Sequence, residues 1–101
     1  MSLIFINGPA SSQTVNSFNR GRATVSMNWD IEGIVSVTGQ TFLALTSSIA
    51  VSIVNDTEDV YAQDWVAPTV QNEVAGVGFD IVIRPAVGTF KGNVTVSWLW
   101  Q

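Results

Sequence analysis

The chain contains neither cysteine nor histidine. Without cysteine there is no disulfide framework and no thiolate zinc site, and without histidine the imidazole ligands of zinc are missing as well. The usual proton acceptor of a serine triad is absent too. A Ser–Lys dyad would have to use Lys91, the only lysine, which lies in a predicted polar turn. We therefore expect a protein that is not an enzyme and has no cofactor or metal.

Charged residues are scarce. They make up 12% of the 101 residues, about half of the usual share, with four cations against eight acidic residues and a net charge of −4. Four cations provide no basic stripe for a phosphate backbone, so nucleic acid is not an expected partner. Because 47% of the residues are hydrophobic and few charges keep copies apart, we expect part of the surface to be covered by other copies or by a larger assembly.

Long apolar runs are also absent. No stretch of the sequence approaches the ~20 apolar residues that a membrane-spanning helix needs. The first nine residues lack a basic region, and their apolar run is shorter than the ~7 residues of a signal-peptide core. We expect a protein without a signal peptide and without membrane contact. The length corresponds to a single domain, residues 1–101.

The residues that are present alternate between apolar and polar types with period 2, which predicts β-strands. We expect an all-β fold, an antiparallel β-sandwich of about six strands spanning residues 22–101. Strands are predicted at 23–30, 34–37, 41–46, 49–54, 78–84 and 93–100, and a short edge strand in the later half of 55–68. The last two main strands are expected to pair with each other through a hairpin loop at 85–92.

Two segments lack this alternation. Residues 1–21 are expected to form an extended N-terminal arm or long loop, because residues 7–21 are rich in Ser, Asn and Gly and carry few large apolar side chains. Residues 55–68 hold four of the eight acidic residues. A calcium ion could bind such a loop, but the spacing and glycine of an EF-hand are missing. We expect a solvated connection there.

Aromatic side chains are the remaining signal. Trp98 is in phase with Val96, and we expect it to pack in the core with Phe79 and Ile81. Trp100 suits a core or an interface position equally well. Trp29, which continues the apolar face of Val25 and Met27 in the strand predicted at 23–30, could stack on a sugar ring or on the apolar surface of a partner, as could Tyr61 and Trp65.

The C-terminal quarter resembles the H-type lectins. The resemblance rests on Gly78–Phe79, which opens a long strand, on Val96–Ser97–Trp98, and on the interval between them. It implies a small six-stranded antiparallel sandwich that assembles as trimers and binds N-acetylgalactosamine. The sugar-contacting Trp–His pair and Tyr of the family are replaced here by Ala86, Val87 and Gly92, and no arginine occurs between Arg22 and Arg84 to fill the family's central-strand position. The resemblance therefore implies the architecture without the usual sugar site.

These observations favour a structural or interaction module of a virion, namely a capsid decoration, tail or fibre protein of a bacteriophage. Such a protein would be made in the host cytoplasm, form homo-oligomers with a trimer favoured, and contact other virion proteins. The alternative is a carbohydrate- or host-receptor-binding protein. Its ligand site would use Tyr61, Asp64, Trp65 and Arg84, whereas Phe79, Trp98 and Trp100 would serve the core or the assembly.

Overall fold

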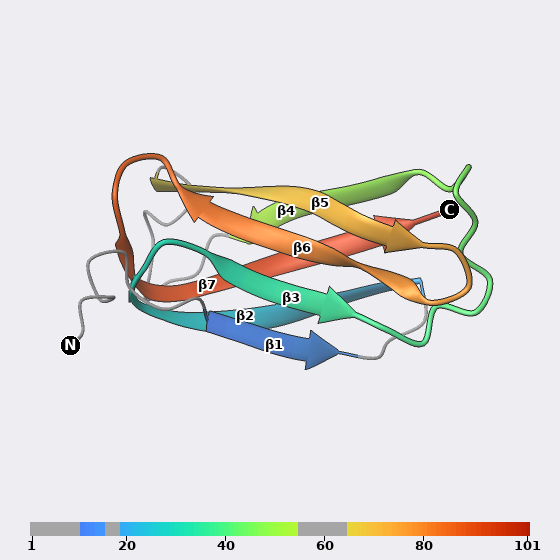
Figure 1. Ribbon diagram of the computed structural model, residues 1–101, viewed down its shortest axis with the longest axis horizontal. Coiled ribbons are helices and arrows are strands. Elements are labelled where there is room, and N and C mark those ends of the chain that lie inside the picture. The colour runs from blue at the N-terminus through green and yellow to red at the C-terminus, as the bar shows by residue number, and fades with distance from the viewer. Residues whose placement is uncertain (1–10, 16–18, 55–64) are drawn as a thin grey trace.

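The computed structural model describes residues 11–15, 19–54 and 65–101, and the regular elements in these ranges are all β-strands (Figure 1). The predicted all-β sandwich is confirmed. In chain order the strands are β1 (Ser11–Val15), β2 (Arg20–Asp30), β3 (Gly33–Val37), β4 (Ile49–Val54), β5 (Val66–Val74), β6 (Gly78–Pro85) and β7 (Phe90–Trp100).

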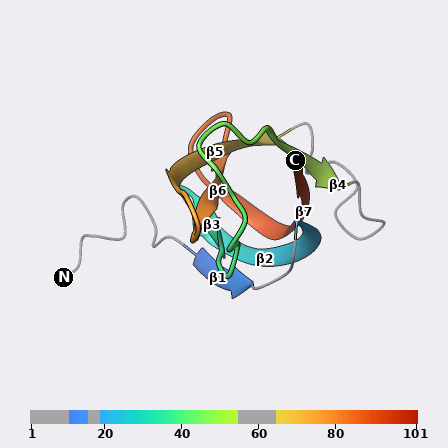
Figure 2. The same cartoon turned by 90° about the vertical axis from the view of Figure 1, so that its right-hand side faces the viewer.

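The strands form two sheets that pack against each other. The four-stranded sheet has the order β1-β3-β6-β5, and the three-stranded sheet has the order β2-β7-β4. All pairings are antiparallel except that of β1 with β3, which is parallel. In the three-stranded sheet the last strand, β7, lies in the centre between β2 and β4. Viewed towards one end, the strands of the two sheets surround a common interior (Figure 2).

The core is built by the alternate residues that point between the sheets. Along β7, Val94, Val96, Trp98 and Trp100 are buried, whereas the residues between them face outwards. Opposite them lie Phe79, Ile81 and Ile83 of β6, which belong to the same apolar cluster. Trp98 is only 3% exposed. Phe79 and both tryptophans of β7 thus occupy the core.

The strand β2 departs from the predicted alternation at its end. The sequence pattern placed Trp29 on the apolar face with Met27, but Trp29 is 59% exposed and Asp30 is buried. A bulge between Asn28 and Asp30 shifts the register against β7, and Trp29 adopts a positive φ of 58°. The extra residue of a bulge inverts the following side chains. The buried carboxylate of Asp30 accepts a hydrogen bond from the Asn28 backbone N–H at 3.2 Å.

Three other predictions were wrong. Residues 11–15, expected in the arm, form β1, and β2 begins at Arg20. Residues 41–46 form turns instead of a strand, with backbone hydrogen bonds from Leu43 to Gln40 and from Ser47 to Ala44. The strands β6 and β7 do not pair; residues 86–89 cross from one sheet to the other. The described part therefore contains seven strands, and one pairing is parallel.

Candidate functional site

The four residues predicted to bind a ligand do not form one site among the residues that the structure describes. Tyr61 and Asp64 lie outside those residues. Trp65 immediately precedes β5, and its carbonyl oxygen accepts a hydrogen bond from the Ala86 N–H at 2.8 Å. Arg84 lies on the outer face of the four-stranded sheet, opposite Ala67 in the β5–β6 register.

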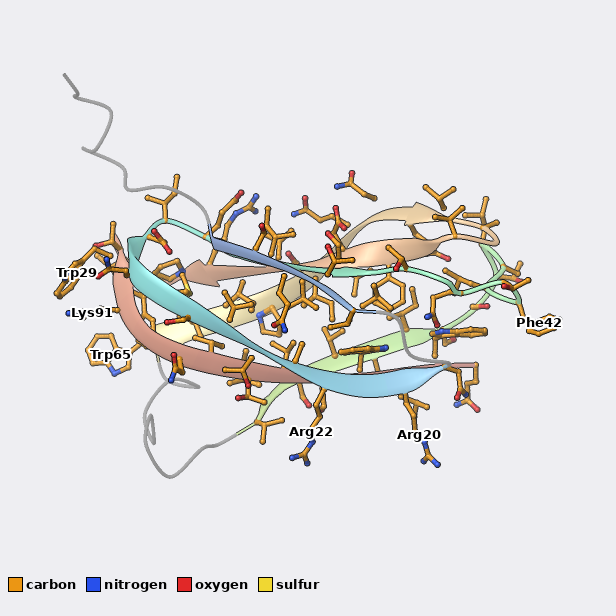
Figure 3. All side chains as sticks on the ribbon, turned by 90° about the horizontal axis from the view of Figure 1, so that it is seen from below. Arg20, Arg22, Trp29, Phe42, Trp65 and Lys91 are labelled. Atoms are coloured by element: carbon orange, nitrogen blue, oxygen red, sulfur yellow. The ribbon has the colours of Figure 1, made fainter. Side chains whose placement is uncertain are left out.

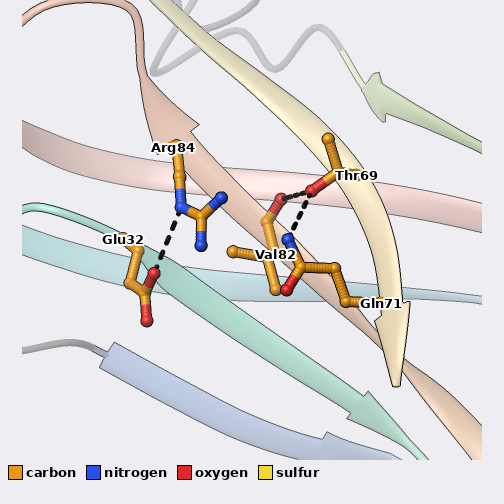
Figure 4. Close-up of polar contacts among 5 residues, drawn as sticks. All are labelled: Glu32, Thr69, Gln71, Val82 and Arg84. Carbon is orange, nitrogen blue, oxygen red and sulfur yellow. Dashed lines mark hydrogen bonds and ion pairs between the residues drawn. The ribbon is translucent and has the colours of Figure 1, made fainter. Parts of the chain in front are cut away.

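Arg84 is occupied by an ion pair. Its Nε donates to Glu32 Oε1 at 3.3 Å, as Figure 4 shows. Thr69 and Gln71 line the same face: the Thr69 hydroxyl donates to the Val82 carbonyl at 3.3 Å, and the Gln71 amide reaches the Thr69 hydroxyl at 3.5 Å. An exposed pair of this kind contributes about 0–1 kcal/mol. The ion pair of Arg84 and the hydrogen bonds of Thr69 are separate contacts on this face (Figure 4).

Exposed apolar side chains gather instead at the end of the sandwich where β2 leads into β3. Trp29 lies in the bulge of β2 and Ile31 follows the end of that strand. Trp65 precedes β5, and Val87 lies in the connection from β6 to β7. Lys91 is placed at the same end by its register with Asn28 (Figure 3). Trp65 is as exposed as Trp29, at 59%. We call Trp29, Ile31, Trp65 and Val87 the tryptophan end.

The opposite end carries a second apolar group, which we call the Phe42 end: Phe42, Leu45, Val74 and Val77. Two backbone hydrogen bonds join its loops, from Gln40 N–H to the Val77 carbonyl at 2.9 Å and from Gly76 N–H to the Leu43 carbonyl at 2.8 Å. Phe42 and the tryptophans lie at opposite extremes of Figure 3.

The Phe42 end rests on a buried polar contact. Trp100 Nε1–H donates to the side-chain oxygen of Gln40 at 2.6 Å, and the Gln40 amide donates to the Thr38 carbonyl at 2.7 Å. Both side chains are buried. Buried polar groups of this kind are rarely left without a partner. The contact therefore fixes the loop at 38–48, which leads from β3 to β4, to the end of β7.

Acidic side chains are dispersed over the described residues. Within them, no three acidic side chains come together as metal ligands would. Nor do they include a helix long and apolar enough to cross a membrane.

Sequence reasoning named Trp29 and Trp65 as side chains that could stack on a ligand or a partner, but it did not predict that they lie at the same end. The alternation placed Trp29 on the apolar face of its strand, and a bulge leaves no reliable mark in a single sequence. Phe42 and Leu45 were assigned to a strand. Phe42 and Leu45 are three positions apart, which does not fit the period of 2 of a strand, and the polar Thr41 and Thr46 flank them. This spacing was the available signal that they belong to turns.

Comparisons of this chain with known protein families, with curated proteins and with solved structures give no match. The resemblance to H-type lectins stays a prediction.

Proposed function

We propose that this protein is a non-enzymatic structural module that self-assembles, and that it serves as a component of a bacteriophage virion. One observation carries the proposal of self-assembly. Of nine large apolar side chains exposed in the described residues, eight belong to the tryptophan end or the Phe42 end. Exposed apolar side chains that gather in one region of a surface often mark an interaction site.

The placement favours contacts between the ends of neighbouring copies. The outward residues of the strands are mostly Ser, Thr, Asn and Gln, which give the sheet faces little apolar area. The two ends have different side chains, so a contact between opposite ends is heterologous. Such a contact either closes into a ring or extends into a filament. A closed ring of three would agree with the predicted trimer.

Light scattering of the purified protein tests self-assembly directly. We expect a mass of about three times the 10.9 kDa of one chain at tens of micromolar. A monomer at this concentration would contradict the proposal. Two double variants locate the contact: Trp29→Ser with Trp65→Ser at one end, and Phe42→Ser with Leu45→Ser at the other. The exposed Ala67→Ser on the sheet face serves as the matched control.

Mixing the two double variants identifies the type of contact. If opposite ends meet, each double variant alone is monomeric, and the mixture forms dimers because one intact end of each kind remains. If like ends meet, one double variant assembles as the wild type does and mixing changes nothing. If both double variants keep the wild-type mass, the ends do not carry the assembly.

The virion location rests on the composition of the sequence: an all-β chain without cysteine and poor in charge. The genes on either side of its own provide the first check. Neighbours that encode capsid or tail proteins would support the location, and antibody labelling of purified particles would then test it. Particles that carry no label would withdraw it.

Carbohydrate binding is the second candidate function, and the tryptophan end favours it. Trp29 and Trp65 expose indole rings at the same end as Lys91. Exposed indoles stack on apolar faces, including those of sugar rings. A glycan array would show selective binding that Trp65→Ser abolishes and Trp65→Phe partly retains. Equal signals for the wild type and Trp65→Ser would exclude this end as the site.

A further inference from the structure

The outer face of the three-stranded sheet carries three of the four cations of the chain. Arg20 and Arg22 alternate along β2 and project away from the body of the sandwich (Figure 3), and Lys91 points outwards from β7. None of these three side chains has a salt bridge within the described residues, where the only such pair joins Arg84 to Glu32. On a chain with a net charge of −4, this face is locally positive.

The same face contains no acidic residue on the described strands. Its outward positions are Arg20, Arg22, Thr24, Ser26 and Asn28 on β2, Lys91, Asn93, Thr95, Ser97 and Leu99 on β7, and Ala50, Ser52 and Val54 on β4. Apart from the cations, most of these side chains end in a hydroxyl or an amide. The face thus combines positive charge with a row of hydrogen-bonding groups.

The strand registers align these residues into rows across the sheet. Arg22, Ser97 and Ser52 form one row, and Arg20, Leu99 and Ala50 form the next. Neighbours in such a row have Cβ atoms about 4.5–5.5 Å apart. The Ser52 and Ser97 hydroxyls are hydrogen-bonded to each other at 3.0 Å. The two arginines, two residues apart on one strand, lie roughly 7 Å from each other along it.

A shallow depression of about 170 Å³ lies between β4 and β7 at these two rows. Ala50, Ser52, Ser97 and Leu99 line it with their outward side chains, and Val51 and Trp98 also border it. The arginines stand on the other side of β7, directly opposite Ser97 and Leu99. The depression therefore offers hydroxyls at one row and an apolar patch at the other. In both rows an arginine of β2 is the neighbour of β7 on its other side.

We infer that this face binds an anionic carbohydrate, a glycan whose sugars bear carboxylate or sulfate groups. The guanidinium of arginine pairs with such groups through two parallel hydrogen bonds. The hydroxyl row matches the hydroxyls of a sugar, and Leu99 offers an apolar contact to its C–H face. The site consists of the rows of Arg20 and Arg22, and Lys91 at the tryptophan end is not part of it. It is thus separate from the two apolar ends and does not depend on self-assembly.

Two other polyanions fit this face less well. Single-stranded nucleic acids bind on aromatic side chains that stack with the bases. The exposed aromatic side chain on the described strands of this sheet is Trp29, which lies at the tryptophan end and away from Arg20 and Arg22 (Figure 3). Duplex binding depends on many phosphate contacts from lysine and arginine, whereas three cations are present here. The row of hydroxyl and amide side chains favours a sugar over an acidic peptide, because a sugar ring presents several hydroxyl groups that can bond with the row.

Titration of the full chain with defined polymers tests the inference. The probes are alginate as a uronic acid polymer, dextran sulfate as a sulfated one, and uncharged dextran. We expect binding of alginate or dextran sulfate that weakens between 0.05 and 0.5 M NaCl, and none of dextran. Preference between the first two identifies the anionic group. Dextran binding equal to theirs, or single-stranded DNA or polyglutamate binding as tightly, would overturn the inference.

Matched variants locate the site. Arg20→Gln with Arg22→Gln should weaken binding about tenfold or more, because charge-assisted hydrogen bonds are lost, while Arg84→Gln on the other sheet should leave it unchanged. Circular dichroism checks that each variant is folded, and Arg22→Lys, which retains the charge, should give an intermediate loss. The mass in light scattering should not change in any of them. Wild-type affinity in the double variant would refute the site and leave the self-assembly proposal untouched.

Discussion

Replacing each of the two buried tryptophans of β7 by phenylalanine separates packing from hydrogen bonding. Trp98 and Trp100 are two residues apart, and both are nearly fully buried. Trp100 Nε1–H donates to Gln40 at 2.6 Å, whereas Trp98 Nε1–H is buried with no hydrogen-bond acceptor in the described part of the chain. The same atoms are removed in both substitutions. The loss from the change of size should therefore be similar, up to about 1.5 kcal/mol at each position.

The polar contribution then has opposite signs at the two positions. In Trp100→Phe the buried Gln40 oxygen loses its indole donor, which adds about 1–3 kcal/mol to the loss. In Trp98→Phe a buried donor without an acceptor is removed, which offsets part of the size loss. We expect Trp100→Phe to be the less stable variant by at least about 1 kcal/mol. For a domain of this size, that difference corresponds to a gap of roughly 4–8 °C in Tm.

Thermal melts followed by far-UV circular dichroism measure the gap without relying on tryptophan fluorescence. A double-mutant cycle with Gln40→Leu and Trp100→Phe isolates the contact between the two side chains. Its coupling energy should reach about 1 kcal/mol, while the cycle of Gln40→Leu with Trp98→Phe should give none. Equal Tm values for the two phenylalanine variants, or a lower value for Trp98→Phe, would refute the assignment of the hydrogen bond.

Truncation of the core and changes at glycines should give further measurable effects. Trp98→Ala should lower the free energy of unfolding in urea by about 3–5 kcal/mol. Val87→Ser, at a side chain that is 84% exposed, should change it by no more than about 0.5 kcal/mol. Equal urea midpoints for Trp98→Ala and the wild type would show that the phase assigned to β7 is wrong. Gly78→Ala should cost at least about 1–3 kcal/mol, because a Cβ there would collide with the backbone carbonyl of Val37. Gly88 also has a positive φ, but no neighbouring atom lies within 4 Å of its Cβ position, so Gly88→Ala should cost less than Gly78→Ala in the same assay.

Local alternation was sufficient to predict most of the strands. It located β3, β4 and β6 to within one or two residues, and it assigned Phe79, Ile81 and Trp98 to the interior. Period 2 arises wherever one face of a strand is buried, so this signal survives in a single sequence.

The same signal does not tell which strands are neighbours. The alternation of β6 and β7 is the same whether they pair edge to edge or face each other across the core, as they do here. β1 escaped notice because Ser, Gln and Thr dominate it. As an edge strand it takes its place from backbone pairing with β3, to which side-chain polarity is a poor guide.

The candidate sites were harder to predict than the fold, because they depend on residues distant in sequence. Arg84 was assigned to a ligand site, and its ion pair with Glu32 spans 52 positions. Arg20 and Arg22 offered a usable signal, since two cations separated by one residue share a face of any strand. The depression beside them could not be foreseen, because β4 and β7 form it only once they are paired.

The central position of β7 sets the order in which the protein can fold as it is synthesised. Both β2 and β4 pair only with β7 in their sheet, and Arg20 meets Leu99 across 79 positions of the chain. Until residues 90–100 have left the ribosome, β2 and β4 have no strand with which to pair in that sheet. Pairings of such long range are slow to form and leave the chain open to aggregation meanwhile. The four-stranded sheet, whose strands all precede β7, can form first and would then serve as the surface on which the second sheet assembles.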